Sequence, residues 1–414
     1  MRDKIQSHLE NPAQLEKLYR TNKTTFKREF SSLYPSLKGN KLADFWHERL
    51  HYEHNEIQSG SRKDIVFILI ICAIAGLIAK IPALFSIDEE FFYPRNIGFI
   101  IFPALSAYFA WKNKISRGKI LVIIAAILTG LFFINSLPNV KSSDTLTLSC
   151  IHLVLFLWSI LGYSFVSGSG INNEKRLDYL KYNGDLIVMT TLILIAGGIM
   201  TGITIGLFSL IGLQIEQFYF DYFGIFGLAS APIIGTYLTQ TNPQLVGKVS
   251  PIIARIFSPL VLFMLLIYLT AIIYLGKDPY QDREFLMIFN ALLIGVMAII
   301  FFSLSEANQS YKSRGEIWVL FLLSCVTIII NGVALSAILF RIAEWGITPN
   351  RAAVLGSNVL ILVNLTMVAK QLYGAVFKKM NIQEVGKTIT YYLPVYVLWT
   401  IIVTFLFPLF FGIK

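Results

Sequence analysis

Residues 316–341 read EIWVLFLLSCVTIIINGVALSAILFR, an apolar run framed by Glu316 and Arg341. No charged side chain interrupts it between these two residues. A run of about 20 apolar residues is long enough to carry an α-helix across the roughly 30 Å hydrocarbon core of a bilayer. Backbone groups in lipid must be hydrogen-bonded within their own segment, so a helix is the expected conformation. The run therefore predicts a membrane-spanning helix.

Ten further apolar runs accompany this one. Hydrophobic residues make up 55% of the 414 positions and charged residues only 14%, whereas soluble domains average about 45–50% and about 25%. The pattern does not alternate as barrel strands do. We therefore expect an all-α, polytopic transmembrane helical bundle of about eleven spans, with ten or twelve left open. The expected spans are 65–85, 96–111, 119–138, 146–167, 184–212, 222–240, 250–275, 285–305, 316–341, 352–369 and 389–412.

Basic residues are distributed unevenly between alternate loops. Beyond residues 1–63, fourteen Lys and Arg fall in loops on the side of the N-terminus and seven on the opposite side, the C-terminal tail included. Cytoplasmic loops of membrane proteins carry the excess of Lys and Arg, so we expect a cytoplasmic N-terminus and an extracytoplasmic C-terminus. The net charge of +10 then reflects topology, and the lipid bilayer rather than nucleic acid is the expected partner.

Residues 1–63 are polar and form a cytoplasmic helical segment separate from the transmembrane domain of residues 64–414. Asn11 and Pro12 predict the start of one helix, and a second follows the turn at Gly39 and Asn40. Their apolar faces are Leu15, Leu18 and Tyr19 in the first helix, and Leu42, Phe45, Trp46 and Leu50 in the second. About 60 residues bury only a marginal core. The segment is therefore expected to pack on the membrane domain, to lie on the lipid surface or to receive a protein partner.

Histidines and cysteines point to no metal or cofactor. His47, His51 and His54 would share one face of the second helix, a spacing that suits zinc, but the nearby carboxylates complete no known motif. Each of the three cysteines lies in an apolar run and is interpreted as a small hydrophobic residue; they are Cys72, Cys150 and Cys325.

Uncharged polar residues accumulate in the eighth to tenth spans. Asn290, Asn331, Asn358 and Asn364 lie within these spans, and Glu306 lies at the cytoplasmic end of the eighth. Each Asn alone is explained by a hydrogen bond between helices. Taken together, they predict a polar seam, and this seam is the first candidate for a hydrophilic pathway.

Two cations fall inside apolar runs, Lys80 in the first span and Arg255 in the seventh. Charges within a span are costly and are kept for a reason. One interpretation is that their long side chains reach the lipid interface. The other is that they line a cavity and bind an anionic small molecule or lipid headgroup.

The segment from Arg341 to Arg351 is the densest polar cluster outside the N-terminal segment. Gly346 and Pro349 are expected to end one helix and reverse the chain, with Thr348 or Asn350 capping the next. Structurally this is a corner at the outer membrane face. Functionally, the two Arg side chains can clamp a phosphate or carboxylate beside Glu344. The candidate ligand site is therefore Arg341, Glu344, Thr348 and Arg351.

Several short motifs resemble an uncharacterised family of bacterial multi-pass inner-membrane proteins, the domain of unknown function four-one-five-three, in its Bacteroidota form. They are Leu15 to Arg20, Phe45-Trp46 with Arg49-Leu50, Tyr93-Pro94-Arg95-Asn96, and the corner, most clearly Glu344, Gly346, Thr348 and Arg351. Trp345 stands where the family has Tyr. The resemblance implies a bacterial inner (plasma) membrane location, and it carries no activity onto these residues.

Three functions remain open. No catalytic signature is present, so no catalytic residue is assigned and an enzyme is the less favoured class. We favour a permease-like transporter that uses the polar seam. The alternatives are a lipid-linked transferase or hydrolase acting through the corner, and a membrane sensor or assembly scaffold acting through residues 1–63.

Pro94 is expected to open the second span.

Overall fold

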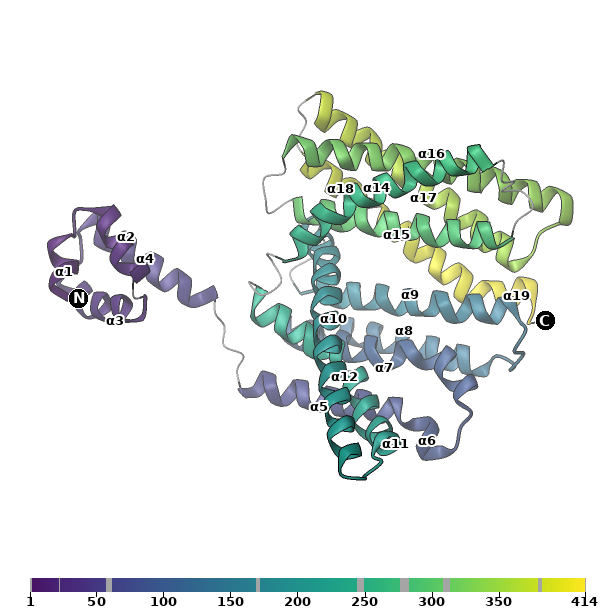
Figure 1. Cartoon of the computed structure of the whole chain (residues 1–414), viewed down its shortest axis with the longest axis horizontal. Helices are drawn as coiled ribbons and strands as arrows, with labels where there is room; N and C mark the ends of the chain where they lie inside the picture. The colour runs from purple at the N-terminus through teal and green to yellow at the C-terminus, as the bar shows by residue number, and fades with distance from the viewer. Residues whose placement is uncertain are drawn as a thin grey trace. The chain divides into compact units, whose positions relative to one another are not determined.

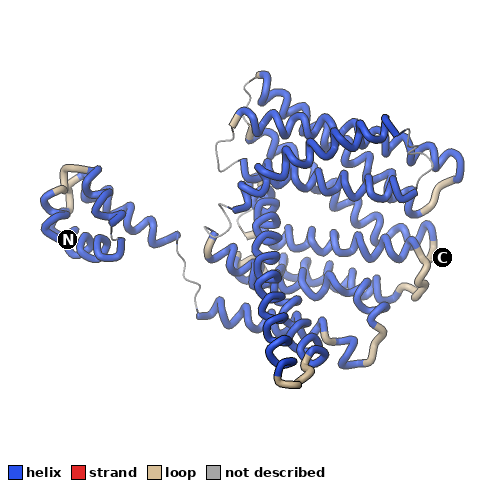
Figure 2. Tube along the Cα trace, viewed as in Figure 1, coloured by secondary structure: helices blue, strands red, loops and turns tan. Residues whose placement is uncertain are grey.

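The structure is a computed structural model that describes residues 2–21, 23–56, 62–168, 172–243, 249–275, 283–307, 313–378 and 382–413. Every regular element within these ranges is a helix (Figures 1 and 2). The predicted all-α fold class is therefore confirmed. The chain divides into two units, which we call the N-terminal unit, Met1–Ile65, and the membrane unit, Val66–Lys414.

The described residues of the N-terminal unit form four helices before α5 (Arg62–Ala79). They are α1 (Arg2–Ser7), α2 (Pro12–Thr21), α3 (Lys23–Leu37) and α4 (Lys41–Glu56). The start predicted at Pro12 is confirmed, because α2 begins there and buries Leu15 and Tyr19. The sequence analysis missed α1 and α3. The signal for α3 was present, since Phe26, Phe30 and Leu33 recur at helical spacing and are buried.

An aromatic cluster forms the core of this unit. The rings of Tyr19 and Phe26 lie 5.5 and 5.2 Å from that of Trp46, centroid to centroid. Phe45 was expected on the same apolar face of α4, but that prediction is wrong because its side chain is 61% exposed. A helix turns about 100° per residue, so consecutive residues cannot both point into one narrow core.

The membrane unit begins within α5 and continues to the end of the chain. Its helices are α5 (Arg62–Ala79), α6 (Ile81–Phe85), α7 (Glu89–Lys112), α8 (Arg117–Ser136), α9 (Asp144–Val166), α10 (Asn173–Leu210), α11 (Glu216–Tyr219), η1 (Phe220–Gly224), α12 (Ile225–Thr241), α14 (Val249–Leu275), α15 (Arg283–Ala307), α16 (Arg314–Trp345), α17 (Pro349–Phe377), α18 (Gln383–Ile401), η2 (Ile402–Leu406) and α19 (Phe407–Phe411).

Two sets of neighbouring helices make up the membrane unit (Figure 1). One set contains α7, α8 and α9, and the other contains α14 to α18. The long helix α10 runs across α7, α8 and α9 in this view, and it contacts α14, α15 and α18 of the other set. Its glycines Gly198, Gly202 and Gly206 face open space. The spacing of apolar runs could not have predicted this crossing, because it depends on how helices pack.

Within the described residues, seven helical stretches are long and apolar enough to cross a membrane, fewer than the eleven spans expected. They are Arg117–Ser136, Asp144–Val166, Asn173–Leu210, Glu216–Thr241, Arg314–Trp345, Pro349–Phe377 and Glu384–Phe411. Shorter apolar stretches occur at Arg255–Thr270 and Leu292–Leu304. These lengths and compositions indicate a multi-pass membrane protein.

The second predicted span starts earlier than expected. Pro94 was expected to open it, but this is wrong, because α7 begins at Glu89 and contains Pro94 in its second turn. Asp88 caps the helix, since its side chain accepts a hydrogen bond from the backbone N–H of Glu90 at 3.0 Å. A side-chain cap of this kind satisfies an N–H group that the helix leaves unpaired. Arg95 therefore lies inside a helix and not in a loop.

Candidate functional site

The predicted corner is a rigid turn between α16 and α17. Gly346, at φ +74°, follows the last residue of α16, and Pro349 is the first residue of α17. Thr348 caps α17 by accepting a hydrogen bond from the backbone N–H of Arg351 at 3.3 Å. The predicted chain reversal is confirmed, and Thr348 is the cap.

Arg351 acts on the backbone of this turn. Its Nη1 donates to the carbonyl oxygens of Trp345 at 2.9 Å and Gly346 at 2.7 Å. The last carbonyl groups of a helix lack partners within it and carry partial negative charge. Arg351 therefore caps the C-terminus of α16. Its Nη1 is used in these two hydrogen bonds.

Trp345 lies between two cations at the corner. The guanidinium carbon of Arg351 is 5.6 Å from the centre of the indole ring, and that of Arg341 is 5.8 Å away. Arg341 is buried, with 8% of its surface exposed, whereas Glu344 is exposed. Within the described residues Glu344 forms no ion pair with either Arg. The corner thus brings together Arg341, Trp345 and Arg351 and leaves Glu344 aside.

The first part of the predicted polar seam is a contact between α16 and α17. Asn331 Nδ2 donates to the backbone carbonyl oxygen of Asn358 at 3.2 Å. Asn331 is 0% and Asn358 is 1% exposed. Asn331 is the eighteenth of the 32 residues of α16, so the contact lies at the middle of that helix. This is the interhelical hydrogen bond that the sequence analysis gave as one interpretation.

The second part of the seam faces another way. Asn364 Nδ2 donates to the hydroxyl of Tyr396 on α18 at 3.0 Å, and that hydroxyl lies 3.7 Å from Met297 Sδ on α15. Asn358 and Asn364 are six residues apart on α17, so they leave the helix about 120° apart and about 9 Å apart along its axis. The seam consists of two polar contacts on different sides of α17.

These contacts leave polar atoms without partners. Oδ1 of Asn331, Nδ2 of Asn358 and Oδ1 of Asn364 are buried, and no described residue hydrogen-bonds to them. An unsatisfied buried polar group costs about 1–3 kcal/mol, so most such groups in native proteins have a partner. The three atoms, two acceptors and one donor, offer hydrogen bonds to a water molecule or an uncharged polar solute.

The remaining seam residues are described only in part. Asn290 is half-buried on α15, seven residues from Met297 and therefore two turns away on the same face. The side chain of Glu306 lies outside the described residues.

Lys80 and Arg255 both have partners. Lys80 Nζ donates to the backbone oxygen of Asp221 and lies 4.3 Å from the centre of the Tyr222 ring. Arg255 Nε lies 2.9 Å from Oε1 of Glu316, which joins α14 to α16. The sequence analysis assigned Glu316 no role, since the two residues are far apart in the chain. Both cations therefore have a structural contact, and binding of an anionic ligand or lipid headgroup by either one stays a prediction.

Arg95 is a buried cation that the sequence analysis placed in a loop. It is 3% exposed and donates to the carbonyl oxygens of Leu137 at 3.3 Å and Pro138 at 3.1 Å, just beyond the end of α8. Its guanidinium carbon lies 4.1 Å from the centre of the Phe91 ring. Arg95 therefore stabilises the C-terminal end of α8 as Arg351 stabilises that of α16. The C-terminal ends of α8 and α16 are thus fixed by the same chemistry.

The histidine row does not form a metal centre in the part of the chain that the structure describes. The imidazole of His47 stacks on the ring of Tyr34, with centroids 3.6 Å apart and planes 20° apart. The side chains of His51 and His54 lie outside the described residues. Among those described, no group of three or more His, Cys, Asp and Glu side chains could hold a metal ion.

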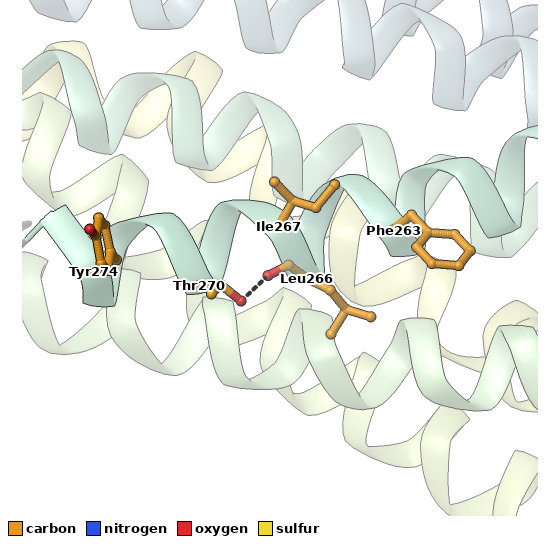
Figure 3. A pocket seen from close by; sticks show the side chains of 5 residues that line it. All are labelled: Phe263, Leu266, Ile267, Thr270 and Tyr274. Carbon is orange, nitrogen blue, oxygen red and sulfur yellow. Dashed lines mark hydrogen bonds between the residues drawn. The ribbon is translucent and has the colours of Figure 1, made fainter.

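A groove of about 520 Å³ lies on the surface of α14 (Figure 3). Phe263, Leu266, Ile267, Thr270 and Tyr274 line it, and Figure 3 shows them along one helix. The hydroxyl of Thr270 donates to the carbonyl oxygen of Leu266 at 2.8 Å, so this hydroxyl already has its hydrogen-bond partner within the helix. Such an apolar surface suits a lipid chain better than a polar substrate.

No protein-family model, curated protein or solved structure matches this chain. Its function therefore has to be argued from the residues described above. We base that argument on the two asparagine contacts of α17, because they combine deep burial, a position near mid-helix and amide atoms without partners among the described residues.

Proposed function

We propose that this protein is a permease-like transporter of the bacterial inner membrane, with about eleven spans. Beyond the seven long apolar stretches, α5, α7, α14 and α15 supply the other four. Two of them carry buried polar residues that suit a span lined by protein and not by lipid alone, Arg95 in α7 and Ser258 in α14. Ser258 Oγ lies 3.1 Å from Ser303 Oγ of α15, and both side chains are buried. Paired polar groups of this kind can be held within a bilayer.

The solute path in this proposal runs beside α17, where Asn331, Asn358 and Asn364 meet α15, α16 and α18. The single observation that carries it is the set of unsatisfied amide atoms at Asn331, Asn358 and Asn364. Binding sites of transporters lie near the bilayer midplane, and these residues lie near the middle of their helices. In the described structure Asn331 and Asn358 are packed in a closed contact between α16 and α17, so the proposed path requires these helices to open around them.

Water access to the seam tests this proposal. In a chain with Cys72, Cys150 and Cys325 replaced by Ala, we would introduce Thr327→Cys, one turn from Asn331 on the same face of α16. A small membrane-impermeant methanethiosulfonate reagent then probes the thiol. The matched control is Ile330→Cys, which is equally buried but lies next to Asn331 in the chain and about 100° from it around the helix.

We expect the thiol at position 327 to react about tenfold faster or more, because only a hydrated thiol ionises readily. The proposal fails if both thiols are inert, or if they react at the same rate, in the membrane-embedded protein. Equal reactivity would mean that the seam is a dry helix contact.

The orientation proposed from the basic residues places the N-terminus in the cytoplasm and the C-terminus outside. With it, the corner of Arg341 and Arg351 faces the periplasmic leaflet. An anionic small molecule or lipid headgroup is still proposed there, through the guanidinium atoms of Arg351 that do not donate to the backbone of the turn. An acid–base role for Glu344 is less favoured, because its carboxylate is exposed and set apart from both Arg side chains.

A second candidate function rests on the N-terminal unit. Nine buried apolar residues give residues 2–50 a core of their own, which a simple membrane anchor does not need. A sensor or scaffold would use such a unit to bind a protein. The test is to delete residues 1–60. This second function is supported if the deletion removes a co-purifying protein chain while transport persists.

A further inference from the structure

The turn between α3 and α4 is held rigidly. Asp44 Oδ1 accepts hydrogen bonds from the hydroxyl of Tyr34 at 3.0 Å and from the backbone N–H of Gly39 at 3.3 Å. Asn40 Oδ1 accepts from two backbone N–H groups in the first turn of α4, at 3.0 and 3.2 Å. Gly39 adopts φ +96°, which a residue with a side chain adopts only with strain. The turn thus has a fixed shape.

The turn presents two cations and one aromatic ring to solvent. Lys38 and Lys41 are exposed, and neither forms a hydrogen bond or ion pair with a described residue. Phe45, 61% exposed, lies one helical turn after Lys41 on the same face. Glu48 is exposed a further turn along α4, away from the α3–α4 connection. The basic and aromatic character is therefore concentrated at the turn.

The rest of the unit has few exposed acidic groups. Three acidic residues are used internally: Glu16 pairs with Arg20 and Arg49, Glu29 with Arg28, and Asp44 with the turn. Exposed charged residues are therefore mainly basic. Among the described side chains of residues 2–50 they are Arg2, Lys4, Lys17, Arg20, Arg28, Lys38 and Lys41, against Asp3, Glu10 and Glu48.

We propose that the α3–α4 turn docks on anionic phospholipid headgroups at the membrane surface, with Lys38 and Lys41 on the phosphates and Phe45 in the interface. Basic residues with an interfacial aromatic ring are what such surfaces attract. Only five residues, 57–61, separate α4 from α5, the first span of the proposed topology. The unit therefore remains close to headgroups at a high effective concentration.

Lipid fits this surface better than a protein does. A stable protein interface buries about 800 Å² on each partner around an apolar centre. Within the described side chains of residues 2–50, Phe45 is the one large hydrophobic residue that is exposed. One ring and two lysines supply charge attraction and shallow insertion, and they do not supply the apolar centre of a protein interface.

The test uses the full chain in vesicles. A single Cys in place of Ser36, in the background without native cysteines, carries an environment-sensitive NBD fluorophore beside the turn. Vesicles contain phosphatidylcholine alone, or with phosphatidylglycerol as about one third of the lipid. We expect a blue shift of the emission only with phosphatidylglycerol, and its reversal when salt screens the charges.

Two double variants locate the surface. Lys38→Gln/Lys41→Gln removes about 1 kcal/mol of attraction per lysine, which lowers the ratio of docked to undocked protein by roughly 30-fold. Lys4→Gln/Lys17→Gln removes the same charge from other exposed positions and should have little effect. Phe45→Ser should also weaken docking, because the interfacial ring is lost.

Three results would overturn the proposal. One is an emission maximum that is the same in both kinds of vesicle and at all salt concentrations. The unsubstituted docking surface is sufficient for this comparison. Another is an equal loss in the two double variants, which would mean unspecific attraction. The third is a shift seen in native membranes but absent from phosphatidylglycerol vesicles, which would identify a protein partner instead. None of these depends on whether the asparagine seam conducts a solute.

Discussion

The N-terminal unit and the α14–α18 set place their polar groups in opposite positions. In residues 2–50 the buried side chains that the structure describes are all apolar or aromatic, and charged groups lie at the surface. In the membrane unit, large apolar side chains are exposed along most helices, while Asn331, Asn358 and Arg341 are buried. The two units have inverted polarity.

This inversion shows that each unit is built for a different solvent. In water, burying apolar surface contributes most of the stability, and the aromatic cluster around Trp46 provides it. Between helices in lipid that force is absent, and close packing and interhelical hydrogen bonds replace it. Gly356 illustrates the packing, because the Trp399 ring lies where its Cβ would be, 2.0 Å from the nearest ring atom. Each variant below distinguishes these two ways of holding helices together.

The largest effect is expected at Trp46, which is 2% exposed. Replacing a buried Trp by Ala costs about 3–5 kcal/mol, and a domain of this size rarely has more than about 3–5 kcal/mol in total. Trp46→Ala should therefore unfold the N-terminal unit within an otherwise folded chain. Limited proteolysis would detect it as rapid cleavage confined to residues before α5.

Phe45→Ala is the matched control, since Phe45 is the adjacent aromatic residue but is 61% exposed. It should leave the protease resistance unchanged. If Trp46→Ala also lowered the melting temperature of the membrane unit, the two units would not be independent. The stability of each unit could then not be attributed to its own solvent.

Glycine packing gives the next effect. Gly356→Ala places a methyl group against the Trp399 ring, whose Nε1 is fixed by a hydrogen bond to Ser357 Oγ at 3.2 Å. Such overpacking typically costs about 1–3 kcal/mol. Gly202→Ala on α10 meets nothing within 4 Å and should be neutral, or stabilising by up to about 1 kcal/mol. Thermal unfolding in detergent compares the pair, and equal shifts would contradict a packing role for Gly356.

The sequence predicted the parts of the fold that depend on local pattern. The apolar runs gave the helices, and Gly346, Thr348 and Pro349 gave the corner, because a turn is determined by the residues that form it. Among the described residues, fewer helices than predicted runs satisfy both length and apolarity, and α7 does not because it carries Arg95 and two carboxylates in its first turns.

Features that depend on distant residues could not be predicted. Gly202 and Gly356 look alike in the sequence, and only the position of Trp399 distinguishes them. Arg255 looked unpaired because Glu316 lies on another helix. The asparagines were correctly placed within their spans, but their division between two sides of α17 depends on which neighbour each one faces.

A smaller effect is expected at Asn331. Asn331→Leu removes one hydrogen bond between helices, and such bonds in membranes average about 0.6 kcal/mol with a maximum near 1.7 kcal/mol. The melting temperature should therefore change little, while thiol reactivity at position 327 falls because the seam becomes dry. Leu323→Asn, a control on the same helix at a 0% exposed site, should be clearly destabilising. A large loss of stability in Asn331→Leu would make the seam structural.

The smallest effect tests how the N-terminal unit arranges charge at its surface. A hydrogen bond from Arg20, with further contributions from Arg49, holds the pKa of Glu16 below its ordinary value. Arg49 also lies 4.6 Å over the Trp46 ring, so the ion pair covers the aromatic core. A carboxyl group with a lowered pKa in the folded state contributes stability above its unfolded pKa of about 4.3, and loses it as the pH falls through the folded value.

Partly exposed ion pairs contribute about 0.2–1 kcal/mol, so acidification below about pH 4.3 should weaken the unit by that amount through Glu16. Glu16→Gln should lower stability at neutral pH and flatten the acid dependence. Glu10→Gln, an exposed residue outside this pair, should leave both unchanged. Protease resistance of residues before α5, measured against pH, would detect the difference. If the profile of Glu16→Gln matched that of the unsubstituted chain, the ion pair over Trp46 would contribute nothing, and the stability of this unit would depend on its apolar core alone.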